Sequence, residues 1–130
     1  MSSTLTVTNL TATNLTDGGG TTSTFANINQ GHAKAWVNFD QYSTNSIRDS
    51  YNVSSVSDDS AGKHTITFNN SMSNTSYIAN VTASNHVNHL IGCTQSGSAF
   101  AAASVQVTTN TTTAFGDNER ACTAVNGDLA

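Results

Sequence analysis

Proline is absent from this chain of 130 residues, and charged side chains make up only 9% of it. With four basic residues there is no basic patch, which argues against nucleic-acid binding through phosphates and against attachment to anionic membranes. No apolar run approaches the roughly 18 residues of a transmembrane helix. The opening residues, Met-Ser-Ser-Thr, lack the basic and apolar regions of a signal peptide. We therefore expect synthesis in the cytoplasm and no membrane insertion.

Small polar residues take the place of the missing charges. Serine and threonine number 38 and asparagine 16, so that 54 of the 130 residues are of these three types. Low charge together with 36% hydrophobic residues argues against a disordered chain. The length fits one domain with a modest core, which would gain stability from oligomerisation.

The first sixteen residues contain a five-residue repeat. Leu-Thr-Val-Thr-Asn is followed by Leu-Thr-Ala-Thr-Asn and by the start of a third copy. These residue types suit an extended chain, and the odd period places successive copies on opposite faces. Such a segment cannot bury both faces alone, so we expect residues 1–30 to form an extended arm or stem. Attachment or trimer contacts are assigned to the apolar side chains Leu5, Val7, Leu10, Ala12, Leu15, Phe25 and Ile28.

From about residue 31 onward the pattern changes to short alternating runs separated by polar turns. Alternation over 33–40 is typical of a strand, residues 47–53 share one face at every second position, and Asp58–Lys63 has the composition of a turn. No segment shows a convincing helical period. About seven strands at this spacing predict an all-β domain over 31–130, either an antiparallel β-sandwich, jelly-roll-like, or a barrel-like domain. The expected core contains Phe39, Ile66, Phe68 and Val107.

No catalytic, metal-binding or cofactor-binding pattern stands out. His86 and His89 lie three apart, and on a strand they would face opposite sides, although one axial histidine per subunit of a trimer would leave an ion site open. The pair Asp58 and Asp59 is better explained as a solvated turn than as catalytic carboxylates. There is no nucleophile elbow, and Gly18–Gly20 lacks the lysine of a phosphate-binding loop. We therefore expect no enzymatic activity, no metal and no cofactor.

The spacing of the two cysteines, Cys93 and Cys122, does not show whether they pair, and a cytosolic chain would keep its thiols reduced.

The aromatic residues are the remaining candidates for recognition: Trp36, Tyr42, Tyr51, Tyr77 and Phe115. Aromatic rings beside amide side chains can stack on sugar rings while the amides bind hydroxyl groups. Among the five, Trp36 and Tyr42 are selected as possible receptor contacts. Packing in the core or at a subunit interface is the more common role of such residues.

Several blocks resemble a known family. The segment Ala33-Lys-Ala-Trp-Val-Asn-Phe39, the segment Ile47-Arg-Asp-Ser-Tyr-Asn-Val-Ser-Ser55, and the run from His64 to Met72 followed by Tyr77 are similar to the C-terminal modules of tail-fibre-like proteins from marine phages and cyanophages. The closing stretches Ser104–Val107 and Cys122–Gly127, and the lead-in from Asp17, extend the similarity to residues 17–127. The resemblance implies a non-enzymatic virion protein and a homotrimer, and it carries over no catalytic residues.

The resemblance leaves two roles open on the virion surface. Members of that family are often the tips of longer chains, whereas here only about thirty residues precede the module. Those residues would either anchor a trimer to the major capsid protein, as a decoration or cement protein, or dock on a tail or fibre protein and leave the module as a tip that binds a host surface glycan. The first role needs no adaptor domain and is favoured.

Overall fold

The computed structural model describes residues 14–16, 19–20, 22–42, 45–83, 89–94, 99–111 and 114–130, without the side chains of residues 25, 26, 89–94 and 111. The chain divides into two compact units, Met1–His32 and Ala33–Ala130. The division lies two residues beyond the expected one. Four of the residues assigned to attachment, Leu5, Val7, Leu10 and Ala12, lie outside the described residues.

The N-terminal unit contains a short hairpin and a helix. Strand β1 (Asn14–Thr16) pairs antiparallel with β2 (Thr22–Thr24), and the Leu15 side chain is 53% exposed. Helix α1 (Phe25–Gly31) follows at once, and the Thr24 hydroxyl caps it by accepting a hydrogen bond of 3.1 Å from the Asn27 N–H. The expectation of no helix was wrong because seven residues are too few to show a period. In the described part of the chain, no helix is long and apolar enough to cross a membrane.

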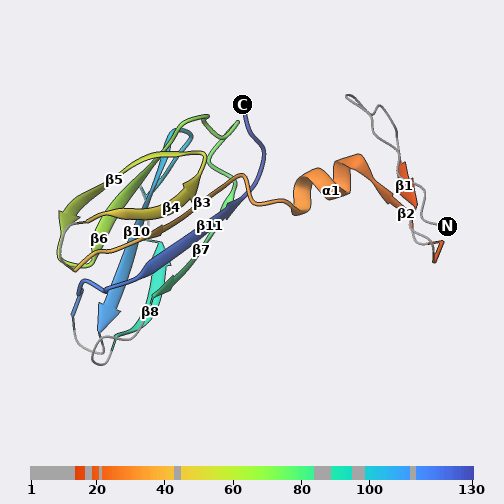
Figure 1. The fold of residues 1–130 in the computed structure, drawn as a ribbon. Helices are drawn as coiled ribbons and strands as arrows, with labels where there is room; N and C mark the ends of the chain where they lie inside the picture. Colours follow the sequence, from red (N-terminus) through yellow and green to blue (C-terminus); the bar gives the residue numbers. More distant parts are fainter. Residues whose placement is uncertain are drawn as a thin grey trace. The chain divides into compact units, whose positions relative to one another are not determined.

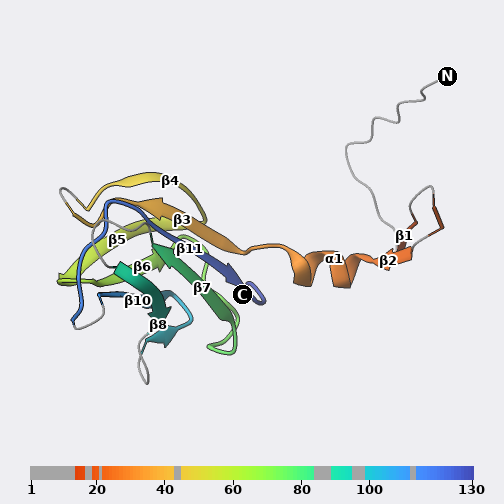
Figure 2. The ribbon, with the colours of Figure 1, turned by 90° about the horizontal axis from the view of Figure 1, so that it is seen from below.

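The second unit is a sandwich of two antiparallel sheets, as Figures 1 and 2 show. The first sheet has the order β4 (Ile47–Tyr51), β3 (Ala35–Phe39), β11 (Ala121–Asn126) and β7 (Ile78–Ala83). The second has the order β5 (Val53–Ser60), β6 (Lys63–Phe68), β10 (Ser104–Thr111) and β8 (His89–Thr94), and β9 (Phe100–Ala101) pairs with the start of β10. The prediction of an all-β fold in antiparallel sheets is thus confirmed.

The core lies between the two sheets and follows the alternation of the strands. In β3 the side chains of Ala35, Val37 and Phe39 are buried, while Trp36 between them is exposed. The same alternation buries every second residue of β6 and β11. The four residues predicted to lie in the core are all buried, which confirms that prediction: Phe39, Ile66, Phe68 and Val107.

Tyr77 closes one end of the core. Its ring packs edge-on against Phe68, with centroids 6.0 Å apart, and its hydroxyl proton is shared between the Ala101 and Ser104 carbonyls at 2.9 and 2.8 Å. Burial raises the pKa of the hydroxyl to about 12. Gly127 is required here because a Cβ at that position would lie 2.6 Å from the Tyr77 Cβ.

The chain passes from the first sheet to the second through a single residue, Asn52. Its φ of 55° is in the left-handed region, where asparagine is tolerated better than most residues. The Asn52 Oδ1 accepts from both nitrogens of Asn70, the backbone N–H at 2.8 Å and Nδ2 at 3.1 Å. Its Nδ2 donates to the Lys34 and Asn70 carbonyls at 3.0 and 3.1 Å. This turn corrects the expectation that residues 47–53 form one run, because Tyr51 is exposed and Val53 is buried.

The turn expected at Asp58–Lys63 is shorter than predicted. Strand β5 continues through both aspartates to Ser60, and the turn consists of Ala61 and Gly62. Gly62 has a φ of 66°, and a Cβ there would lie 2.4 Å from the Thr109 carbonyl oxygen, so only glycine fits. Asp58 and Asp59 therefore lie on a strand, although the composition of this segment predicted a turn.

Replacing Asn52 tests the crossing between the sheets. Asn52→Gly keeps the backbone conformation but removes all four hydrogen bonds, and we expect it to lower the free energy of unfolding by about 2 kcal/mol. Asn52→Ala adds the cost of a left-handed non-glycine residue, for about 3 kcal/mol in total. Asn45→Gly is the matched control, because Asn45 also has a positive φ, and among the described residues its Nδ2 donates to one group, the Val56 carbonyl. Urea unfolding would measure all three, and equal losses for Asn45→Gly and Asn52→Gly would contradict the assignment.

Candidate functional site

The outward side of the first sheet presents the exposed tryptophan. The strand register aligns two rows of side chains across β7, β11, β3 and β4, in that order. The residues of these rows, which we call the outer face, are Asn80, Ala124, Trp36 and Tyr51 in one row and Thr82, Cys122, Asn38 and Asp49 in the other.

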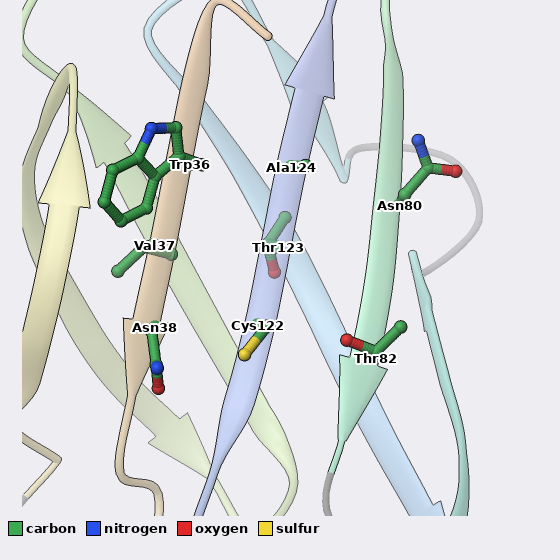
Figure 3. Close-up of a pocket in the computed structure, with 8 residues that line it drawn as sticks. All are labelled: Trp36, Val37, Asn38, Asn80, Thr82, Cys122, Thr123 and Ala124. Carbon is green, nitrogen blue, oxygen red and sulfur yellow. The ribbon is translucent and has the colours of Figure 1, made fainter.

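The row that contains Trp36 combines large and small side chains. Trp36 is 37% exposed and Tyr51, its partner across the strands, is 55% exposed. On the other side of Trp36 lies Ala124, whose short side chain leaves a depression in the sheet. Figure 3 shows the indole on β3 and the side chains of Asn80 and Thr82 on β7, with β11 between them. The result is a shallow open groove of about 390 Å³.

The surface of the groove is predominantly apolar, and the Trp36 ring, Asn80 and Thr82 are among the residues that line it. Asn80 and Thr82 are exposed and carry neutral donors and acceptors, whereas the Oδ1 of Asn38 is buried, and Asp49 is the charged member of the outer face. Cys122, on the floor of the groove, is a free thiol and is half-buried. A flat, uncharged ligand with one apolar face and several hydroxyl groups would match this surface, because the ring would contact its C–H groups while the amides bind its oxygens.

The structure does not bring the two predicted receptor contacts together. Tyr42 is 61% exposed, but it follows the end of β3, where its N–H donates to Asp40 Oδ1 at 2.9 Å. Tyr42 lies six positions beyond Trp36, in a bend that follows the end of β3. Tyr51 takes its place beside the tryptophan. The alternating pattern of residues 47–53 predicted that Tyr51 lies on a strand. It could not predict that Tyr51 pairs with Trp36, because the register between two strands is not encoded in the local sequence of either.

The remaining attachment residues lie in the N-terminal unit. Leu15 is on β1, and Phe25 and Ile28 are on α1, where Ile28 is half-buried. Leu15 is therefore the described residue of this set that offers an exposed apolar side chain.

Among the described histidine and acidic side chains, His64 and Asp59 have shifted pKa values. His64 is fully buried, and this burial lowers its pKa below 6.5 against the opposing effect of Asp58, Asp117 and Asp59. Burial raises the pKa of Asp59, but hydrogen bonds from Thr65, Gln106 and Ser57 outweigh it and hold the pKa below 3.8. Among the residues with described side chains, no group of three or more His, Cys, Asp or Glu could hold a metal ion.

Comparison with known proteins gave no relatives. No protein-family model, no curated protein and no solved structure matches this chain.

We predict that truncating Trp36 on the outer face will destabilise the protein less than truncating Phe39, a core residue of the same strand. We expect Trp36→Ala to lower the free energy of unfolding by about 1 kcal/mol, because the ring is only partly buried and packs on the outside of the sheet. Phe39→Ala on the same strand removes a fully buried ring and should cost about 3–5 kcal/mol. Thermal and urea unfolding of the two variants would measure the contrast. If Trp36→Ala lowered the free energy of unfolding as much as Phe39→Ala does, the indole would be needed for the stability of the sandwich.

Proposed function

We propose that this chain is a non-enzymatic structural protein of a phage virion, displayed on the particle surface as a homotrimer. The proposal rests on the similarity of residues 17–127 to tail-fibre-like modules, and the antiparallel sandwich is compatible with it. The jelly-roll-like connectivity expected from the sequence does not hold for the described strands, because β3–β4 and β5–β6 are each a hairpin within one sheet, whereas the chain of a jelly roll alternates between its two sheets. The best role is that of a capsid decoration or cement protein, with the major capsid protein as its partner.

The observation that carries the proposal is the division into two compact units. The sandwich holds its own core, made from both of its sheets. Every described residue of that core lies at or beyond Ala35, and the N-terminal unit carries Leu15 with 53% of its surface exposed. A small unit with an exposed apolar side chain is suited to attachment, because burying that side chain against a partner releases about 25 cal/mol per Å² of apolar area.

A second role, as a tail-fibre tip that binds a host glycan, is favoured by one specific observation. Trp36 and Tyr51 are paired, exposed and flanked by amide and hydroxyl side chains on the outer face. An aromatic pair costs free energy when left in water, so its exposure is informative where the neighbouring side chains offer hydrogen bonds to a ligand. In this role the sandwich is the binding module and the N-terminal unit docks on a tail or fibre protein.

Truncation tests the attachment role. Deleting residues 2–16 should leave a sandwich with an unchanged circular dichroism signal in the β region and an unchanged unfolding midpoint, because every described residue of the core lies at or beyond Ala35. Added to virions that lack the chain, the truncated protein should fail to bind, whereas the full chain should bind. Electron microscopy of the decorated particles measures occupancy. Full occupancy by the truncated protein would overturn the assignment of the anchor.

Substitution on the outer face tests the recognition role. We expect Trp36→Ala and Tyr51→Ala to abolish binding of the full chain to host cells or to a glycan array. Tyr42→Ala is the matched control: it also removes an exposed aromatic ring, but one beyond the end of β3. Loss of binding in Tyr42→Ala with retention in Trp36→Ala would move the binding site away from the outer face. Absence of binding by the unaltered chain would leave decoration as the supported role.

A further inference from the structure

A buried polar cluster surrounds the side chain of Gln41, just after β3. Gln41 is 3% exposed, and its Oε1 lies 3.0 Å from the Asn118 backbone nitrogen and 3.0 Å from the Thr109 hydroxyl. A backbone N–H can only donate, so the atom facing it is the amide oxygen. The amide nitrogen of Gln41 therefore faces the other way, where it lies 3.1 Å from Nδ1 of His64.

This arrangement fixes the protonation state of His64. Because the Gln41 Nε2 donates, Nδ1 of the imidazole accepts, and the single proton of the neutral ring is on Nε2. That nitrogen is buried without a hydrogen-bond partner among the described residues. Its nearest acidic neighbour is Asp58, with Oδ1 at 3.9 Å. The ring also packs against Phe39 with centroids 5.5 Å apart.

A second proton on the imidazole has no place in the cluster. It would attach to Nδ1 and point at the Gln41 amide nitrogen, which carries protons of its own. Turning the Gln41 amide by 180° would give His64 an acceptor, but it would then set the NH₂ group against the Asn118 N–H. No orientation of one carboxamide accepts from both groups, so a protonated His64 breaks one of these two hydrogen bonds.

The carboxylates near the imidazole and the burial of the ring shift the pKa of His64 in opposite directions. Asp58 and Asp59 from β5 and Asp117 from the segment before β11 favour the protonated form, and burial opposes them and dominates. The other contacts of the ring named above, Phe39 and Gln41, are uncharged. Lys63, next to His64 on β6, places its Nζ 4.5 Å from the centre of the Phe115 ring. The imidazole is therefore neutral near pH 7, and its site is intact.

We propose that the cluster of His64, Gln41 and Asn118 is an acid-sensitive latch, which holds the segment Gly116–Asn118 against the end of β3 and releases it when His64 takes up a proton. The segment is also held by the Gln41 N–H, which donates to the Asn118 carbonyl at 2.9 Å, by the Gly62 N–H, which donates to Asp117 Oδ1 at 2.6 Å, and by the Gly116 N–H, which donates to the Thr109 carbonyl at 3.1 Å. Its other end is tied to Thr109, whose hydroxyl lies 2.7 Å from the Gly116 carbonyl oxygen. Loss of the bond between Gln41 Oε1 and the Asn118 N–H loosens the connection between β10 and β11. The inference is independent of the proposed function.

The sign of the effect follows from linkage. The pKa of His64 is lower in the folded chain than its ordinary value of 6.5, so the unfolded chain takes up a proton first as the pH falls. The contribution of the latch to stability is fully present above about pH 6.5 and decreases as the pH falls from there toward the folded-state pKa. One proton corresponds to at most about a tenfold rise in the unfolding equilibrium constant per pH unit.

The test compares the full chain with two variants between pH 7.5 and pH 5. His64→Gln offers an acceptor to Gln41 but does not titrate, and His32→Gln removes an exposed histidine of the N-terminal unit as the matched control. We expect the unfolding constant of the full chain and of His32→Gln to rise below pH 6.5, by up to tenfold per pH unit, more steeply than that of His64→Gln. The protection factor of the Asn118 amide in hydrogen exchange should fall over the same range in the full chain and stay constant in His64→Gln.

Two results would overturn the proposal. The first is an Asn118 protection factor that stays constant between pH 7.5 and pH 5 in the full chain. The second is an imidazole that carries its proton on Nδ1 at neutral pH, as measured by the ring-nitrogen chemical shifts of the unaltered protein. The nitrogen measurement needs no variant, so it decides the matter even if His64→Gln does not fold.

Discussion

The chain crosses between the two sheets several times, and the shortest of these crossings, from β4 to β5, is made by one asparagine. Asn52 separates β4 from β5, so the two strands belong to opposite layers although they are neighbours in sequence. Its carboxamide is bonded to segments on both sides of the crossing, Lys34 before β3 and Asn70 after β6. If this residue could not adopt the left-handed conformation, the inward side chains of β5 would not meet those of β3, and the core would not close.

The outer face follows from the same alternation that makes the core. Once Ala35, Val37 and Phe39 point inward, Trp36 and Asn38 must point outward. The core places few demands on outward positions, so their residue types are free to serve contacts with other molecules. The aromatic pair of Trp36 and Tyr51 lies where the fold gains least from it, and for this reason the outer face is the strongest candidate for recognition.

Local patterns in the sequence were sufficient to predict which side chains of a strand are buried, but not to predict which strands pair with one another. Alternation identified the buried residues of β3 and β6, since period two is visible within one strand. It did not separate β4 from β5, because a single left-handed residue interrupts the strand without changing the composition. It did not show that Tyr51 lies beside Trp36, because register across a sheet is set by contacts far apart in sequence. Helix α1 was missed because it is two turns long and its signal is one capping threonine.

Strand β5 is at an edge of its sheet, and its composition affects how the protein behaves in concentrated solution. Edge strands invite a further strand from a neighbouring molecule, and proteins oppose this with charges and irregular pairing. Here the ladder with β6 shifts register twice, and the strand ends in Asp58 and Asp59. Two copies approaching edge to edge would bring these carboxylates together. Hydrogen bonds from Thr65, Gln106 and Ser57 lower the pKa of Asp59 against the opposing effect of burial, so its charge at this edge persists to a lower pH than that of an ordinary aspartate.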